Sequence, residues 1–134
     1  MVIVSAVDGA EDRRVVEEGV SLAEAFGEEL HVLHVASRED IERPEGGGSE
    51  TVLERAENRA ADVGADVADD FVAVGRIGRP AQEIDDYVSS TETRYLVVGG
   101  RKRTPIGKAL FGSITQSVLL SVDCPVVAVR ERDE

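Results

Sequence analysis

The sequence predicts an α/β fold, an open five-stranded parallel sheet with helices on both faces. Short apolar runs alternate along the chain with stretches whose apolar residues recur at helical spacing. Each connection between runs is about a dozen residues or longer and carries a helix, which is what crossovers between parallel strands require. In such sheets ligands bind beyond the carboxyl ends of the strands, where the strand order reverses.

The chain begins with a clear strand and a clear helix. Residues 2–7 form a nearly unbroken apolar run, typical of a strand buried on both faces. A helix is expected over 13–26, capped by Asp12 and followed by Gly27, because apolar residues recur there in steps of three and four. Residues 30–35 are the second predicted strand.

The later helices are predicted from residues suited to their ends. Ser49 can cap a helix that Gly64 ends, and Pro80 suits the first turn of the next helix. Ser113 is expected to cap the last helix, over 113–121, since Gln116 completes the spacing of a capping box. The remaining predicted strands are 71–74, 95–98 and 125–129.

The histidines and the cysteine predict neither a metal centre nor a nucleophile. His31 and His34 fall on opposite faces of their strand, so they are poor candidates for a shared metal ion. Cys124 is the only cysteine, cannot form an internal disulfide and has no evident base nearby. We interpret it as a small packed hydrophobic residue in a protein of the reducing cytoplasm.

Composition restricts the class of protein. The 134 residues, 42% hydrophobic and 31% charged, predict one folded domain over 1–134. No apolar run approaches the roughly 20 residues that cross a bilayer, so no membrane association is expected. The net charge of −12 argues against nucleic acid as a partner. Excess carboxylate and scarce lysine suggest a protein working in concentrated salt, although an acidic protein from an ordinary cytoplasm has the same composition.

The stretch 98–113 combines a strand end, a glycine turn, a basic loop and the start of a helix. The first N–H groups of a helix lack internal partners and attract anions. Arg101, Lys102, Arg103 and Lys108 add positive charge in an acidic chain, so a phosphate-bearing ligand suits the loop. The loop can also be a plain connection whose cations offset local acidity.

Asp8-Gly9, after the first strand, is the second candidate element. If the first and fourth strands are neighbours, this turn and the glycine turn open into the same crevice. Asp8 could then accept a hydrogen bond from a ribose hydroxyl while the loop holds phosphates. Asp-Gly is equally a good turn without any ligand.

These motifs together resemble the universal stress protein (UspA) family over essentially the full chain. Nucleotide-binding members carry a glycine, two residues, a second glycine, nine residues, then glycine followed by serine or threonine. Gly99 matches the first glycine, and Gly112 and Ser113 match the final pair at the correct spacing. The segments 4–9 and 124–127 resemble the family's first and last strands.

The resemblance implies a Rossmann-like sheet of order 3-2-1-4-5, of the adenine nucleotide alpha hydrolase type, in a cytoplasmic homodimer. It also implies binding of ATP, ADP or AMP, with or without Mg. The dimer would form through the last strand, Pro125 to Arg130, and a regulatory protein partner is expected that the sequence does not identify. The positions assigned to nucleotide are Ala6, Val7 and Val35 for adenine, Asp8 for ribose, and Val98, Gly99, Arg101, Gly112, Ser113, Ile114 and Thr115 for ribose and phosphates.

Lys102 departs from the family pattern, because it replaces the second glycine of the motif. Glycine there lets the backbone approach phosphate closely, and a side chain could close the pocket. The lysine ammonium could instead pair with a phosphate, and we favour this charged-partner interpretation.

Three functions remain open. The first is a dimeric, nucleotide-binding stress-response regulator, and the second is a dimeric stress protein without nucleotide. The third, a slow ATP-hydrolysing enzyme, is less favoured because no catalytic residue stands out. A Walker A loop is excluded, since Gly107-Lys108 is followed by Ala109 and the preceding glycine is missing.

Overall fold

The computed structural model describes residues 1–37, 51–100 and 112–130. Within these residues one five-stranded parallel sheet has the order β3-β2-β1-β4-β5. The strands are β1 (Val2–Ala6), β2 (Glu29–Ala36), β3 (Val72–Ile77), β4 (Thr93–Gly99) and β5 (Val126–Val129). The helices are α1 (Arg13–Phe26), α3 (Val52–Ala65), α4 (Pro80–Ser90) and α5 (Ser113–Ser121), and a short 3-10 turn, η1 (Ala10–Asp12), precedes α1. The predicted fold class and strand order are confirmed.

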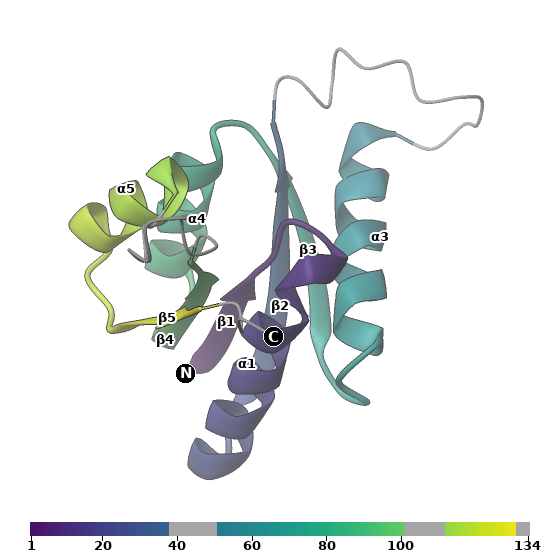
Figure 1. Ribbon diagram of the computed structural model, residues 1–134, viewed down its shortest axis with the longest axis vertical. Coiled ribbons are helices and arrows are strands. Elements are labelled where there is room, and N and C mark those ends of the chain that lie inside the picture. The colour runs from purple at the N-terminus through teal and green to yellow at the C-terminus, as the bar shows by residue number, and fades with distance from the viewer. Residues whose placement is uncertain (38–50, 101–111, 131–134) are drawn as a thin grey trace, which may run out of the picture.

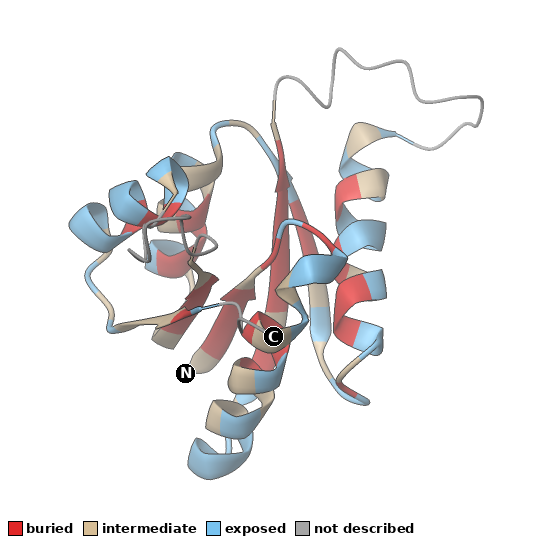
Figure 2. Cartoon of the chain, in the orientation of Figure 1, coloured by how far each residue is buried: buried red, intermediate tan, exposed pale blue. Residues whose placement is uncertain are grey.

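The helices form a layer on each face of the sheet (Figure 1). Helices α1 and α3 cover one face, where Val16 and Ala60 pack with Ile3 of β1. Helices α4 and α5 cover the other, where Ile84 and Val118 pack with Val4 of the same strand. Successive residues of β1 therefore enter opposite cores, which is why the strand reads as a continuous apolar run. Figure 2 shows this burial along the central strands, between the two helix layers.

Three helix ends follow from local sequence. Gly27 ends α1 in the left-handed conformation, with φ of 65°, as predicted. Pro80 begins α4 at its first position, also as predicted. The cap of α3 is Thr51 rather than Ser49, which lies outside the described residues. The Thr51 hydroxyl accepts from the Glu54 N–H, and the Glu54 carboxylate accepts from the Thr51 N–H, each at 3.1 Å.

Two glycines have packing roles that the predicted boundaries missed. Gly64 does not end α3, which continues to Ala65. A Cβ at Gly64 would lie 2.4 Å from the Phe71 ring, so the missing side chain makes room for that ring. Gly75 lies inside β3, which runs to Ile77 rather than stopping at 74. A Cβ there would lie 2.5 Å from the backbone nitrogen of Glu57, so Gly75 allows α3 to pack closely on β3.

The strand order fixes where a ligand site is expected. From β1 the chain builds outward to β2 and β3 on one side, then crosses back to β4 and β5 on the other. The carboxyl ends of β1 and β4, which are parallel neighbours, therefore lie at the reversal point of the sheet. In the part of the chain that the structure describes, no helix is long and apolar enough to cross a membrane.

Candidate functional site

A cavity of about 500 Å³ opens at the carboxyl ends of β1 and β4, against the first turns of α4 and α5. It brings together ten of the twelve residues predicted to contact a nucleotide. These are Ala6, Val7, Asp8, Val35, Val98, Gly99, Gly112, Ser113, Ile114 and Thr115. The other two predicted residues, Arg101 and Lys102, lie outside the described residues. We call this space the reversal-point cavity.

Six further residues line the cavity and were not predicted as site residues. They are Glu11, Asp12, Leu33, Pro80, Ile84 and Gly100. Asp12 was interpreted only as a helix cap. The strand topology could have identified them, because the chain segments that follow β1 and β3 begin at the same edge of the sheet as Gly99.

One wall of the reversal-point cavity is apolar. Leu33 and Val35 of β2, Val98 of β4 and Ile84 of α4 all belong to the core on the α4/α5 face, and each is at most 8% exposed. A wall of buried branched side chains favours a flat apolar group over a charged one.

Asp12 supports the Asp8 turn from inside the cavity. Its Oδ2 accepts a hydrogen bond of 2.6 Å from the Asp8 backbone N–H. Its Oδ1 lies against Gly99, where a Cβ would approach to 2.9 Å. Gly99 therefore has a role that needs no ligand, since it leaves room for a carboxylate from the start of α1. Asp12 is the N-cap residue of α1, as predicted, but its side chain makes no capping hydrogen bond to that helix.

The first turn of α5 lines the cavity. Its N-cap is Gly112 rather than Ser113, and among the described residues no side chain caps the helix. The predicted capping box of Ser113 and Gln116 is therefore wrong. Gly112 has φ of −68°, so its place does not depend on a left-handed backbone. Thr115 fixes the helix to the sheet, because its hydroxyl donates to the Gly99 carbonyl at 2.8 Å.

The ionisable groups among the described lining residues are all carboxylates, namely Asp8, Glu11 and Asp12. Partial burial raises the pKa of the Asp12 carboxyl above its ordinary value. The Asp8 N–H opposes this rise, while the negative charges of Glu11 and Asp8 add to it. A phosphate would be repelled at this side of the cavity and favoured at the α5 side, where the helix N-terminus lies.

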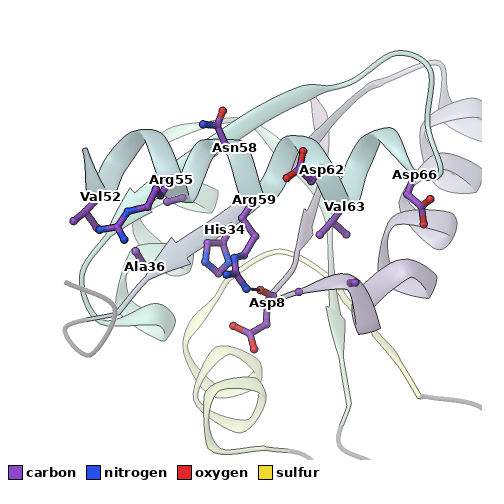
Figure 3. A pocket seen from close by; sticks show the side chains of 13 residues that line it. Asp8, His34, Ala36, Val52, Arg55, Asn58, Arg59, Asp62, Val63 and Asp66 are labelled. Carbon is purple, nitrogen blue, oxygen red and sulfur yellow. Dashed lines mark hydrogen bonds between the residues drawn. The ribbon is translucent and has the colours of Figure 1, made fainter. Parts of the chain in front are cut away.

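A second cavity, of about 880 Å³, lies on the α3 side of the same strand ends (Figure 3). Asp8 lines both cavities, and His34 and Arg59 are prominent in the second one. His34 is 6% exposed and its Nδ1 lies 2.9 Å from the Val7 carbonyl oxygen. The described residues that line this second cavity are Asp8, Gly9, Ala10, His34, Ala36, Val52, Arg55, Ala56, Asn58, Arg59, Asp62, Val63 and Asp66. We call it the α3-side cavity.

The histidines and the cysteine occupy the places expected of them. His31 faces Tyr87 of α4, with 2.5 Å between Nδ1 and the phenol oxygen, whereas His34 faces the α3 side. Within the described residues no group of three or more potential ligand side chains could hold a metal ion. Cys124 packs against the core on the α4/α5 face, and burial raises the pKa of its thiol.

Comparison with known proteins decides the family. A model of the universal stress protein family matches residues 1–130. The chain belongs to the universal stress protein family. A universal stress protein of Mycolicibacterium smegmatis is 41% identical over 49 residues, which cover 37% of this chain and 38% of that protein. The resemblance carried by the glycine motif and the terminal strands is thus confirmed.

Three solved universal stress proteins match this chain over nearly their whole length. One from Archaeoglobus fulgidus is 26% identical, covers 96% of this chain and 97% of its own, and has a TM-score of 0.65. A universal stress protein in complex with cAMP is 19% identical, with 98% of both chains covered and a TM-score of 0.72. An Archaeoglobus fulgidus protein in complex with dAMP is 21% identical, with 96% of both chains covered and a TM-score of 0.62.

Proposed function

We propose that this universal stress protein binds an adenine nucleotide (ATP, ADP or AMP) in the reversal-point cavity. The observation that carries the proposal is the convergence of three features in one space. An apolar wall, an exposed carboxylate at Asp8 and the uncapped start of α5 all line the cavity. Each suits a different part of a nucleotide: the base, the ribose and the phosphates.

The residues fit the nucleotide by chemistry. Leu33, Val35 and Ile84 offer apolar surface to an adenine ring. The Asp8 carboxylate can accept hydrogen bonds from ribose hydroxyls. The first N–H groups of α5, after Gly112, can donate to phosphate oxygens, and the helix dipole favours negative charge there. Magnesium enters the proposal only as an ion bound to the phosphates of the nucleotide.

Two relatives of the same fold support the choice of nucleotide. The solved complexes described above contain cAMP in one protein and dAMP in another. Both ligands are adenine nucleotides, and both chains are covered almost completely by this one. At 19% and 21% identity the relatives establish the fold, so the extension of the ligand to this chain is our proposal.

We further propose that the protein acts as a homodimer and regulates an as yet unidentified partner protein in a stress response. β5 lies at one edge of the sheet, and Val126, Val127 and Ala128 are only partly buried there. An apolar edge strand is a template for pairing with a second chain, and a two-fold dimer through Pro125 to Arg130 would cover it. Bound nucleotide would change the shape of the protein or its choice of partner, and would not be hydrolysed rapidly.

Calorimetric titration of the purified protein with ATP, ADP and AMP, together with mass spectrometry of any released ligand, tests the binding step. We expect one nucleotide per chain for at least one of the three. A protein that yields no nucleotide on denaturation and gives no binding heat with any of them would contradict the proposal. It would leave the alternative of a dimeric stress protein without nucleotide.

A further inference from the structure

The Asp8 turn is held from the α3 side by residues that do not line the reversal-point cavity. The ladder between β1 and β2 ends just before Asp8, where the Val7 N–H donates to the Leu33 carbonyl at 2.8 Å. The next backbone group, the Val7 carbonyl, is bound by the His34 side chain instead of by a strand neighbour, with Nδ1 2.9 Å from its oxygen. A carbonyl oxygen only accepts, so Nδ1 must carry the proton and donate.

His34 is placed to hold this carbonyl firmly. Its side chain is 6% exposed, and it lies on β2 directly beside the end of β1. Leaving a buried donor without an acceptor costs more free energy than a hydrogen bond contributes on balance. The imidazole ring therefore stays bonded to the Val7 carbonyl. Val7 and Asp8 share a peptide unit, so fixing the Val7 carbonyl fixes the plane from which Asp8 begins.

Arg59 and Asp12 hold the other backbone groups of the turn. The Arg59 guanidinium donates from α3 to the Asp8 carbonyl at 3.4 Å, the contact drawn as a dashed line in Figure 3. Asp12 accepts from the Asp8 N–H at 2.6 Å. The backbone of Asp8 is thereby tied on both sides, while its carboxylate remains exposed at the mouth of both cavities.

We propose that His34, assisted by Arg59, is a positioning residue for the nucleotide site. From the α3 side it sets where the Asp8 carboxylate meets the ribose. The inference rests on the proposed function, since it assigns the source of ribose recognition within that site. It concerns residues on the face of the sheet opposite α4 and α5, which do not line the reversal-point cavity.

The test compares ATP with 2′,3′-dideoxy-ATP, which lacks the hydroxyls that Asp8 would recognise. We expect wild type to bind ATP about tenfold more tightly, on the scale of one hydrogen bond to a charged group. In His34→Leu this ratio should fall to about threefold or less, while the affinity for the dideoxy nucleotide stays within about twofold of wild type. A merely structural effect of the substitution would weaken the binding of both nucleotides to the same extent.

Conservative and neighbouring variants serve as controls. His34→Asn places an amide N–H near the position of Nδ1 and should restore most of the ratio. Arg59→Met should lower it in part. Arg55→Met changes another arginine one turn earlier on α3, which also lines the α3-side cavity but has no bond to Asp8, and it should leave the ratio unchanged. Should His34→Leu fail to fold, the Arg59 and Arg55 pair carries the comparison.

The outcomes separate this inference from the proposed function. A wild type that binds neither ATP nor its dideoxy analogue, and neither ADP nor AMP, would overturn both. A wild type that binds ATP and dideoxy-ATP equally would overturn the inference and leave adenine-nucleotide binding in place. A wild type that prefers ATP while His34→Leu and Arg59→Met keep the full preference would overturn the inference alone. Amide hydrogen exchange gives a readout without nucleotide, because the Asp8 N–H should exchange faster in His34→Leu than in His34→Asn. Equal exchange in the two variants would also count against the positioning role.

Discussion

Gly99→Ala is the substitution for which the structure gives the sharpest expectation. A Cβ at this position would lie 2.9 Å from Asp12 Oδ1 and 3.4 Å from Val15 Cγ2. The second distance is ordinary contact, whereas the first forces the carboxylate to move. Because that carboxylate also accepts from the Asp8 N–H at 2.6 Å, moving it breaks the bond that ties the turn to α1.

The magnitude follows from the bond that is lost. A hydrogen bond to a charged group contributes about 1.5–3 kcal/mol, and the solvent-exposed Asp8 amide can rehydrate, so we expect about 1.5 kcal/mol. For a chain of 134 residues, the average unfolding entropy converts this loss into a fall in Tm of about 5 °C. Thermal unfolding followed by circular dichroism measures it.

Two variants isolate the cause. Among the described residues, a Cβ at Gly112 meets nothing within 4 Å, so Gly112→Ala should not lower Tm. In an Asp12→Ala background the cost of Gly99→Ala should largely disappear, because the clashing oxygen is gone. A Gly99→Ala protein with unchanged Tm would refute the close packing. An equal fall in Tm with and without the Asp12 side chain would refute the assignment of the close contact to Asp12.

Further expectations concern pH, the nucleotide loop, assembly and salt. The hydrogen bond from Arg94, together with the N-terminal ammonium, holds the pKa of the Glu28 carboxyl below its usual value. The stability it confers is present above the ordinary glutamate pKa and lost as pH falls through the folded-state value. Glu28→Gln should therefore unfold at a lower denaturant concentration than wild type at pH 7, and the two proteins should converge once the pH has fallen through the lowered folded-state pKa of Glu28. Lys102→Ala should weaken ATP binding by roughly 1–2 kcal/mol if the ammonium pairs with phosphate, and tighter binding in Lys102→Gly would reverse that assignment. Val127→Lys should weaken the homodimer in light scattering, and a wild-type monomer at micromolar concentration would count against the dimer. With a net charge of −12, Tm should rise between about 0.1 M and about 2 M KCl, and a flat response would remove the high-salt interpretation.

The sequence was a good guide to the fold because apolar periodicity reports burial directly. Continuous runs marked the central strands, and the spacing of apolar residues marked α1 within its observed bounds, Arg13–Phe26. It was a poorer guide where a glycine serves a distant neighbour. Gly64 resembled a helix stop, yet it makes room for Phe71. Gly75 lay beyond the predicted strand 71–74, yet it belongs to β3 and lets α3 approach that strand.

The candidate site was predictable for residues whose place after a strand indicated their position at the edge of the sheet. The glycines and Asp8 follow strand ends, so the topology alone brought them together. The support of the turn was not predictable, because it joins residues far apart in the chain. His34 meets the backbone of Val7, 27 positions away, and Arg59 meets Asp8, 51 positions away. Only the register of β1 against β2 and the packing of α3 create these contacts.

The most direct test of the account is to locate a bound nucleotide on the protein. Amide chemical shifts of ¹⁵N-labelled protein, followed during titration with AMP, report which backbone groups a ligand approaches. We expect the largest changes at Asp8, Val35, Gly99 and Ser113, which surround the reversal-point cavity. Changes gathered instead on α3, at Arg55, Arg59 and Asp62, would place the nucleotide in the α3-side cavity and contradict the site proposed here.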